Sequence, residues 1–487
     1  MELHFFKEYF VLEYITNYKN KEKKNILKLF TEQENNSVTG SRHFLETKDG
    51  IIGIDCGAYQ GEDKKEEVDK KNSNLKNISK LKWQILTHAH YDHCGLLPLL
   101  VKNGYLGKIY STSATRDLAN LIMLDSAKIQ QYDLEQGKRE NIVYSEKDCV
   151  KAMNSFNTIS YEKKESLSKH LEFEFFDAGH IMGSSLTELF VKEGFFNKEK
   201  RILFTGDLGR YINKPLIEIP QGENIIAPHY IVLESTYGNR IHSSIETTKM
   251  DLAKIINETI AKGGKVLIPS FAAQRTQDLI AELHKLQDLK WIPNVKIYVD
   301  SPLAESITNV FSIHPECYNT KSYNDYICNH GNPLNFKELC FVKSPKEGDR
   351  IDAKKDPCII IAASGMLESG RSPNHLYNLI SDEKNTVLTC GYMASGTLGR
   401  KLLDGDKTIT VLGKKKKVKA RIESIDGMSS HADKNEILQF LDSIDTSKLK
   451  KIFLVHGDVE SRKSLKQLLE SKGYKVEIME QGKEYKL

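Results

Sequence analysis

The chain has 487 residues, which is long for a single hydrophobic core, so we expect two large domains. Hydrophobic residues make up 39% of it and the mean hydropathy is −0.45, values that are typical of a globular protein in water. The 70 basic and 66 acidic residues leave a net charge of +4, which identifies no partner. No apolar run approaches the roughly 18 residues of a membrane-spanning helix, and no secretory signal opens the chain, so we expect no membrane association and a cytoplasmic location.

The first part of the chain predicts short strands after an N-terminal extension at residues 1–24. We expect the strands at 25–30, 37–47, 50–61 and 83–87, with a polar loop or short helix at 62–80. The strand at 83–87 ends directly before three histidines and an aspartate. Side chains at such strand ends form the functional sites of many α/β proteins.

From about Glu234 onward, the pattern predicts alternating strands and helices. We expect helices at 250–264 and 272–286, and strands at 265–270, 295–301, 357–365 and 385–391. These strands are apolar on both faces, which is typical of parallel strands covered by helices. Segments 417–433 and 451–458 then return to strands that end in His and Asp. We therefore predict that the second domain is inserted within the first.

The segment HAHYDH at residues 88–93 is the main candidate for a metal site. In an extended segment His88 and His90 point to the same side and can bind one metal, and the turn that follows places Asp92 and His93 at a second position. Three imidazoles side by side would be poorly satisfied without a metal. The eight cysteines form no Cys-x-x-Cys pair, which argues against a closed, structural zinc site. Imidazole and carboxylate ligands instead favour an open, catalytic site for zinc, manganese or iron.

Other candidate ligands also follow apolar strands, namely Asp55, His180, Asp207, His431 and His456. Asp207 has two carboxylate oxygens, so it is able to bridge two metals roughly 3.5–4 Å apart. Taken alone, a histidine such as His180 or His456 is more often a hydrogen-bonded core or surface residue than a metal ligand, and Asp55 alone could cap a loop. The histidine cluster favours the metal interpretation for each of them.

In this order, the motifs resemble those of the metallo-β-lactamase superfamily. The segments after Asp207 resemble its β-CASP nucleases, the branch that includes the endonuclease of cleavage-and-polyadenylation complexes. They are ESTYGNR (234–240), IPSFAAQRTQDL (268–279), VDSPLA (299–304), SGMLESGR (364–371), GYMASGTLGR (391–400), SSHAD (429–433) and LVHGD (454–458). The resemblance implies an α/β fold, a metallo-β-lactamase αββα sandwich with an inserted α/β β-CASP domain. It places the sandwich at 25–238 and 429–487 and the β-CASP domain at 239–428.

The resemblance also implies two zinc ions bridged by Asp207. One ion would be held by His88, His90 and His180, and the other by Asp92, His93 and His456. Asp55 would orient a ligand histidine. Water activated by the metals would attack phosphorus, and the products would carry a 5′-phosphate and a 3′-hydroxyl. His431, kept protonated by Glu234, would give a proton to the leaving 3′ oxygen.

His456 matches the third β-CASP motif, which is a histidine in RNA-directed members and usually apolar in the DNA-repair branch. We therefore expect single-stranded RNA as the substrate, cut internally, from the 5′ end, or both. The groove between the domains would hold the strand through Arg275, Ser364, Gly365, Arg371 and Arg400. A salt bridge between the domains is the alternative role for each arginine.

Three other functions remain as alternatives. A DNA nuclease of the same family is one, although His456 argues against it. Other hydrolases with a metallo-β-lactamase fold lack an insertion as long as the one of over 200 residues between Asp207 and His431. A pseudoenzyme would have lost metal ligands, whereas all seven are present here. A homodimer is left open.

Overall fold

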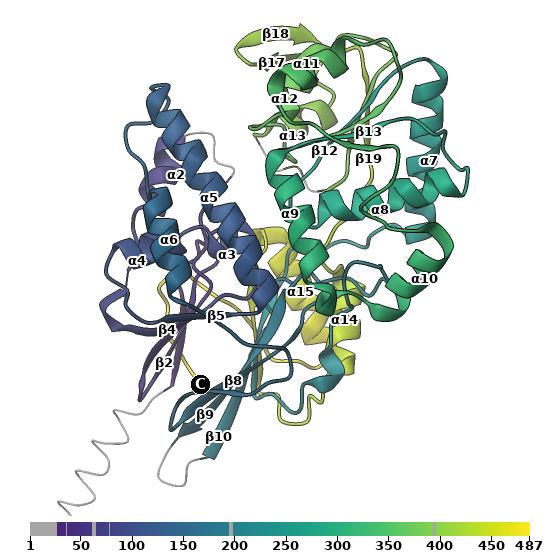
Figure 1. Ribbon diagram of the computed structural model, residues 1–487. Helices are drawn as coiled ribbons and strands as arrows, with labels where there is room; N and C mark the ends of the chain where they lie inside the picture. Colours follow the sequence, from purple (N-terminus) through teal and green to yellow (C-terminus); the bar gives the residue numbers. More distant parts are fainter. Residues whose placement is uncertain are drawn as a thin grey trace, which may run out of the picture.

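The computed structural model describes residues 27–35, 37–60, 65–76, 78–193, 198–391, 393 and 396–487. These residues form two seven-stranded sheets, one six-stranded sheet and a separate two-stranded hairpin. Figure 1 shows the two larger sheets in the lower part of the molecule and the smaller sheet with its helices above them. We call the two larger sheets with their helices the sandwich, and the elements from α7 to β19 the inserted domain. The predicted extension at 1–24 lies outside the described residues.

The first sheet of the sandwich has the strand order β22-β1-β2-β3-β4-β5-β6. Its strands are β1 (Lys28–Thr31), β2 (His43–Thr47), β3 (Gly50–Ile54), β4 (Leu81–Ile85), β5 (Lys108–Ser111), β6 (Phe156–Thr158) and β22 (Tyr485–Lys486). Strands β3 to β6 are parallel, so each connection between them has to cross over the sheet. These connections contain α2 (Lys65–Asn72), η1 (Ile78–Lys80), α3 (Tyr91–Cys94), α4 (Leu97–Lys102), α5 (Ser113–Glu135) and α6 (Glu146–Asn154).

The second sheet has the strand order β21-β20-β11-β10-β9-β8-β7. Its strands are β7 (Glu165–Ser168), β8 (Leu171–Asp177), β9 (Ser185–Glu193), β10 (Lys198–Phe204), β11 (Tyr230–Glu234), β20 (Lys451–Val455) and β21 (Val476–Ile478). The helical segments that accompany it are η2 (Gly222–Asn224), α14 (Lys434–Ser443) and α15 (Val459–Ser471). Strand β20 pairs in parallel with β11, although the whole inserted domain separates them in sequence.

Alternating side chains along the strands divide the core of the sandwich into three layers. Ile52 and Ile54 of β3 face Phe173 and Phe204 of the second sheet. Ile51 points the other way, into the core under α4, α5 and α6. On the far face of the second sheet, strands β11 and β20 pack against α14 and α15. The order helix, sheet, sheet, helix confirms the predicted αββα sandwich.

The inserted domain contains a six-stranded, wholly parallel sheet with the order β14-β13-β15-β12-β16-β19. Its strands are β12 (Val266–Pro269), β13 (Ile297–Asp300), β14 (Leu339–Phe341), β15 (Ile359–Ala362), β16 (Thr386–Thr389) and β19 (Arg421–Ser424). One face is covered by α7 (Ile245–Ala261), α8 (Arg275–Asp288) and α9 (Pro302–Ile313). The other is covered by α11 (Pro345–Ala353), α12 (Ser372–Leu379) and α13 (Leu398–Leu403). The predicted doubly covered parallel sheet is confirmed; η3 (Pro315–Cys317) and α10 (Thr320–His330) complete the domain.

Several predicted elements differ in extent from those of the structure. The expected strand at 37–47 contains only β2, and the expected strand at 417–433 contains β19 followed by the loop that carries His431. A hairpin of β17 (Thr408–Val411) and β18 (Lys414–Lys417) was not predicted. Its second strand is four lysines, which have no apolar alternation to indicate a strand.

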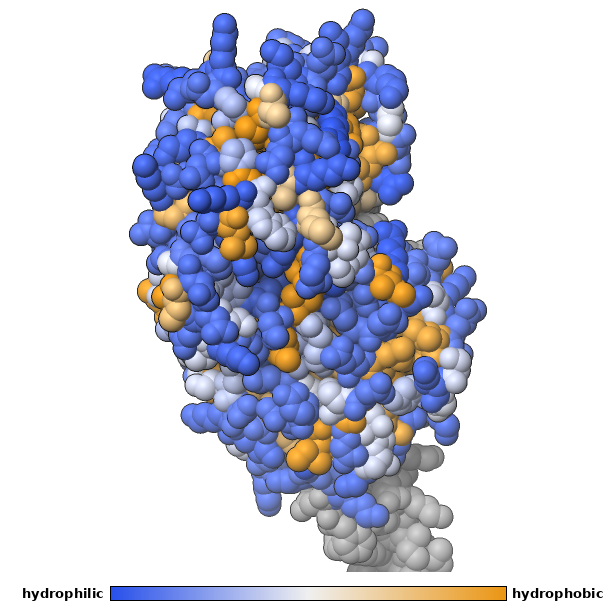
Figure 2. Space-filling view, turned by 90° about the vertical axis from the view of Figure 1, so that its right-hand side faces the viewer, coloured by the Kyte–Doolittle hydropathy of each residue, from blue (hydrophilic) through white to orange (hydrophobic). Residues whose placement is uncertain are grey.

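Polar contacts join the inserted domain to the sandwich. Lys214 Nζ lies 2.7 Å from a carboxylate oxygen of Asp278. His314 Nε2, just after α9, lies 2.9 Å from a carboxylate oxygen of Asp117 on α5. Figure 2 shows the face turned to the right of Figure 1, where hydrophobic residues form small patches among hydrophilic side chains. None of the helices in the described ranges is long and apolar enough to cross a membrane.

Candidate metal centre

The candidate ligands lie where strands of the sandwich end. His88 and His90 follow β4 within a few residues, and His180 follows β8. In the same way, Asp207 follows β10 and His456 follows β20. The loops between these strands and their neighbours approach one another so closely that they need glycine. A Cβ atom on Gly57 would lie 1.5 Å from the backbone oxygen of Asp92. Any larger residue there would push the loop of the histidine cluster away.

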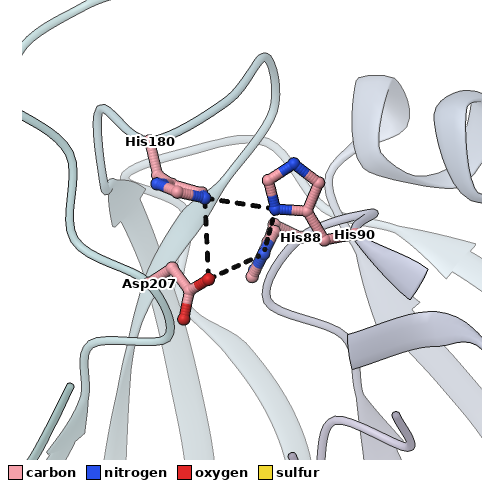
Figure 3. Close-up of side chains that lie close together, drawn as sticks. All are labelled: His88, His90, His180 and Asp207. Atoms are coloured by element: carbon pink, nitrogen blue, oxygen red, sulfur yellow. Dashed lines mark hydrogen bonds and ion pairs between the residues drawn. The ribbon is translucent and has the colours of Figure 1, made fainter. Parts of the chain in front are cut away.

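The first set of ligand atoms belongs to His88, His90, His180 and Asp207, and they lie within 4.8 Å of one another. Figure 3 shows the four side chains directed toward a common space. His90 Nδ1 lies 3.2 Å from Nε2 of His88 and 3.2 Å from Nε2 of His180. Asp207 Oδ2 lies 3.4 Å and 3.6 Å from the same two Nε2 atoms. Three imidazole nitrogens and one carboxylate oxygen are a ligand set typical of zinc.

The second set belongs to Asp92, His93 and His456. Asp92 Oδ2 lies 3.3 Å from His456 Nε2 and 3.9 Å from His93 Nε2. The helical turn α3 places Asp92 and His93 on this side, away from His88 and His90. The division of HAHYDH into two pairs, predicted from its spacing, therefore agrees with the geometry.

Asp207 lies between the two sets. Its Oδ2 faces the first, and its Oδ1 lies 3.3 Å from His93 Nε2 and 3.5 Å from His456 Nδ1. Oδ1 is buried and has no hydrogen-bond partner among the described residues. A buried carboxylate oxygen without a donor is unfavourable by roughly 1–3 kcal/mol or more, and a cation removes that penalty. The residues present therefore fit a metal, with Asp207 placed to contact both sets.

Burial keeps the histidines of the first set neutral. It lowers the pKa of His90 to about 3, with His88 as the next cause. It also lowers the pKa of His88 and of His180. A neutral ring has a nitrogen lone pair available, which metal binding requires.

Asp55 lies behind the second set. Its Oδ2 accepts a hydrogen bond from His93 Nδ1 at 2.8 Å, which leaves His93 Nε2 to face the ligand space. The backbone N–H of Thr87 donates to Asp55 Oδ1 at 2.8 Å and fixes the carboxylate. This geometry agrees with the predicted orienting role, in which a carboxylate sets the tautomer and direction of a ligand histidine.

Two threonines that the sequence analysis did not single out hold other ligands in the same way. Thr87 Oγ1 lies 3.1 Å from His88 Nδ1, and Thr236 Oγ1 lies 2.9 Å from His456 Nδ1. Thr236 also donates to Glu234 Oε2, so Glu234 is linked to a ligand histidine. Thr87 lies directly before HAHYDH and Thr236 lies within ESTYGNR. Their positions next to these motifs are the feature of the sequence that could have identified them.

His431 and Glu234 are in contact, as expected for a proton donor and its partner. His431 Nδ1 lies 3.1 Å from Glu234 Oε1, which also accepts the backbone N–H of Leu208 at 2.7 Å. Burial lowers the pKa of His431, but the carboxylates of Glu234 and Asp207 outweigh it and raise the pKa to about 8. This direction favours the protonated imidazole that a proton donor requires.

A cavity of about 440 Å³ opens over these ligands, between the sandwich and the inserted domain. The sandwich contributes His90, Asp92, His180, Asp207, His431 and His456 to its lining. The inserted domain contributes Phe271, Arg275, Leu303, Ile307 and Met366, among others. This volume is in the range of small-ligand sites, and both domains are needed to form it.

Of the five predicted RNA contacts, Arg275 lines the cavity and the other four do not. Its Nε is buried and has no hydrogen-bond partner among the described residues, so the guanidinium retains a free donor. Gly365 lies close by, since a Cβ atom there would be 3.0 Å from the ring of Phe271. Ser364 Oγ accepts backbone N–H groups of its own loop, both at 3.3 Å.

The other two arginines form ion pairs within the inserted domain. Arg371 Nη1 lies 3.0 Å from Oδ1 of Asp300, which is buried. Arg400 Nη2 lies 2.8 Å from Oδ1 of Asp404, one helical turn further on, and both side chains are about half exposed. Neither of these two pairs links the two domains.

Three family models match the chain. They are described as a metallo-beta-lactamase superfamily domain at residues 44–194, a Beta-Casp domain at 276–402 and a Zn-dependent metallo-hydrolase RNA specificity domain at 415–479. The chain belongs to the β-CASP family of the metallo-β-lactamase superfamily. The predicted fold class and resemblance are confirmed, and the Zn-dependent metallo-hydrolase model agrees with metal binding at the cluster described above.

Among similar β-CASP proteins, the transcription termination factor FttA of Methanocaldococcus jannaschii is 32% identical over 85% of this chain, and that of Methanococcus maripaludis is 31% identical over 85%. This chain spans 64% of the length of each. Ribonuclease TTHA0252 of Thermus thermophilus is 29% identical over 91% of this chain and 96% of its own length.

A solved structure shares the fold. It is a protein of unknown function from Enterococcus faecalis V583, with a TM-score of 0.54 and 13% identity, over 95% of this chain and 100% of that one.

Proposed function

We propose that this protein is a zinc-dependent ribonuclease that hydrolyses phosphodiester bonds of single-stranded RNA. The observation that carries the proposal is the pair of ligand sets at the interdomain cavity, with the Asp207 carboxylate close to both. The names of similar proteins, a ribonuclease and a transcription termination factor, support RNA as the polymer. So does the RNA specificity model that matches residues 415–479.

In this proposal His88, His90 and His180 hold one zinc ion, and Asp92, His93 and His456 hold the other, with Asp207 between them. When bound, the two ions make water nucleophilic at neutral pH and stabilise the charge that develops on the phosphate. Asp55 keeps the Nε2 of His93 directed at the ligand space. Thr236 does the same for His456 through its Nδ1.

His431 supplies the proton that the leaving 3′ oxygen requires. Glu234 holds the Nδ1 side of its ring, so the proton on Nε2 is the one available to the substrate. The raised pKa of about 8 keeps that proton in place at neutral pH. The products carry a 5′-phosphate and a 3′-hydroxyl.

Two further parts of the proposal concern the chain and its surroundings. Residues 25–238 and 429–487 form the metallo-β-lactamase domain and 239–428 the β-CASP domain, with boundaries that fall between β11 and α7 and between β19 and α14. The enzyme acts in the cytoplasm. Arg275 contacts a phosphate in the cavity, while Ser364, Gly365, Arg371 and Arg400 contact the strand further along.

The proposal is tested by incubating the zinc-loaded protein with 5′-labelled, 3′-labelled and circular RNA, and with DNA of the same sequence. Cutting of linear RNA that stops in a chelator and returns with zinc is expected. Cleavage of circular RNA would show internal attack, and its absence with single-nucleotide products from the 5′ end would show exonucleolytic attack. Faster cutting of DNA, or no cutting of either polymer by protein with two bound zinc ions, would contradict the proposal.

A further inference from the structure

The cavity over the metal ligands has one wall that the proposed chemistry does not use. Helix α5 of the sandwich and helix α9 of the inserted domain pack against each other beside it. The side chains that α5 contributes to the lining include Ile122, Asp125, Ser126, Ile129 and Gln130. They lie three, four, seven and eight positions after the first, which is the spacing of one helical face. The whole face of α5 is therefore turned toward this space.

Apolar surface dominates this wall. Ile122 and Ile129 come from α5, Leu303 and Ile307 from α9, and Phe271 from the loop after β12. Phe271 remains 43% exposed and Ile129 45% exposed, although both lie beside a cavity. Apolar and aromatic side chains that stay accessible in a concave site are the usual means of holding a flat, hydrophobic ligand.

One polar group on the wall lacks a partner. The hydroxyl of Ser126 donates to Tyr91, and Gln130 donates to Ser126 and accepts the backbone N–H of Val143. Asp125, by contrast, has no hydrogen bond or ion pair within the part of the chain that the structure describes. Burial raises the pKa of its carboxyl, and the exposed Lys128 opposes the shift. A partly desolvated carboxylate is stabilised by N–H donors, and none of the described side chains donates a hydrogen bond to Asp125.

We propose that this wall binds one nucleobase of the RNA strand, with the ring against Phe271 and Asp125 accepting hydrogen bonds from the edge of the base. The inference rests on the proposed ribonuclease activity, which brings a phosphate of the same strand to the metal ligands in this cavity. Stacking on an aromatic ring suits every base, so Phe271 gives affinity without selectivity.

Selectivity comes from Asp125, because a carboxylate only accepts hydrogen bonds. Guanine presents two adjacent donors, N1–H and the N2 amino group, which match the two oxygens of a carboxylate. Cytosine and adenine present one amino group each. Uracil presents a single N–H between two carbonyl oxygens, which the carboxylate repels. The expected order at this position is guanine first and uracil last, with a preference of at least about fivefold, as for a bidentate contact.

The test uses RNA of fixed length whose bases are randomised around one cleavage region, with the cut positions sequenced. Wild-type enzyme is expected to enrich guanine over uracil at one position near the cut. In Asp125→Asn, whose amide both donates and accepts, the ratio at that position is expected to fall to about twofold or less. Glu135→Gln is the matched control. It lies on the same helix, is exposed and accepts a hydrogen bond from Gln131, so the preference is expected to persist. An unchanged preference in Asp125→Asn would overturn the inference.

A binding experiment separates this failure from a failure of the proposed function. Fluorescence anisotropy is measured with hexamers that carry one guanine or one uracil, in the Asp207→Ala background, where cleavage is not expected. Adding Asp125→Asn should reduce the difference between the hexamers, and adding Phe271→Ala should weaken both equally. If the wild-type protein did not cleave RNA but the binding preference for the guanine hexamer were present, only the ribonuclease proposal would be contradicted. Equal binding of the two hexamers in the Asp207→Ala background would contradict only the nucleobase site.

Discussion

The sandwich and the inserted domain each bury a cluster of histidine and aspartate, and the two clusters differ in how they are completed. In the inserted domain, His375 Nδ1 lies 2.7 Å from Asp352 and His375 Nε2 lies 2.9 Å from Asp300, so both ring nitrogens have carboxylate partners. In the sandwich, ring nitrogens of several histidines face one another, and Asp207 Oδ1 has no hydrogen-bond partner among the described residues. The cluster in the inserted domain is complete through its own ion pairs, whereas the cluster in the sandwich needs a cation.

The pKa directions of the first ligand set report the same difference. In the second set, burial lowers the pKa of His93, but Asp207 and Asp55 outweigh burial and raise it. Burial lowers the pKa of His375, but Asp300 and Asp352 raise it to about 9, so a proton completes this cluster. Burial lowers the pKa of His90 to about 3, so its ring stays neutral and available. A buried His–Asp group therefore indicates a metal site when its members lack protein partners, and the composition of the group alone does not distinguish the two cases.

The largest expected effect is the loss of activity on removing a ligand of the sandwich cluster. Asp207→Ala is expected to lower the rate of RNA cleavage by at least about a thousandfold and to reduce the bound zinc, since it deprives both sets of a ligand. Initial rates, elemental analysis and circular dichroism measure activity, metal and fold. His170→Ala is the control, because His170 pairs with Asp49 outside the cluster. Full zinc content and full rate in Asp207→Ala would contradict the assignment.

Removal of His431, the proposed proton donor, is expected to have the next largest effect. His431→Ala should lower the rate by about 10²–10⁴-fold while leaving the zinc content unchanged. With a substrate that has a more acidic leaving group, such as a p-nitrophenyl phosphodiester, His431→Ala should lower the rate of hydrolysis much less. Equal losses with both substrates would show that His431 has another role.

The cluster of His375, Asp300 and Asp352 in the inserted domain predicts that the stability of the protein depends on pH. His375 binds its proton more tightly in the folded state, where its pKa is about 9, than in the unfolded chain, where it is about 6.5. The contribution is complete below about pH 6.5 and is lost as the pH rises through about 9, with a total of about 3 kcal/mol. Urea unfolding between pH 6 and pH 9.5 measures it. His375→Asn should reduce this slope relative to the wild-type protein and keep the zinc content, and a slope unchanged from wild type in this variant would contradict the prediction.

The smallest effect is expected at an exposed ion pair. Arg400 and Asp404 are both about half exposed, so Arg400→Ala should change the free energy of unfolding by no more than about 0.5 kcal/mol. If Arg400 also contacts RNA as proposed, the KM for RNA should rise about threefold at low salt and less at high salt. Asp404→Ala breaks the same pair without removing the cation, so an equal rise in KM there would argue against a phosphate contact.

The structure brings together the candidate ligands that the sequence singled out, and the sequence could identify them because each lies in a short local pattern. HAHYDH and the residues at strand ends needed only the alternation of an extended chain and the chemistry of imidazole to be identified. Thr236 was not singled out, because its role depends on His456, which lies on another strand. Asp125 was not predicted either, since the face of α5 mixes apolar and polar residues and its orientation depends on packing against α9.

The RNA contacts were predicted from arginines beside small residues, and this signal was weaker. Arg275 lies in the cavity, whereas Arg371 is paired with Asp300. The difference depends on which loops of the inserted domain face the sandwich, which is set by the pairing of β20 with β11 far away in sequence. Local patterns carry no information about that pairing.

The pairing of β20 with β11 also affects how the protein is made. A ribosome that stalls between residues 207 and 431 leaves a nascent product with His88, His90, His180 and Asp207 but without His431 and His456. Such a fragment carries the first ligand set and lacks both the proton donor and the last ligand of the second. Under the proposed function, a nascent chain that stops before His431 is therefore not expected to cleave RNA, because it has neither the proposed proton donor nor the complete second ligand set.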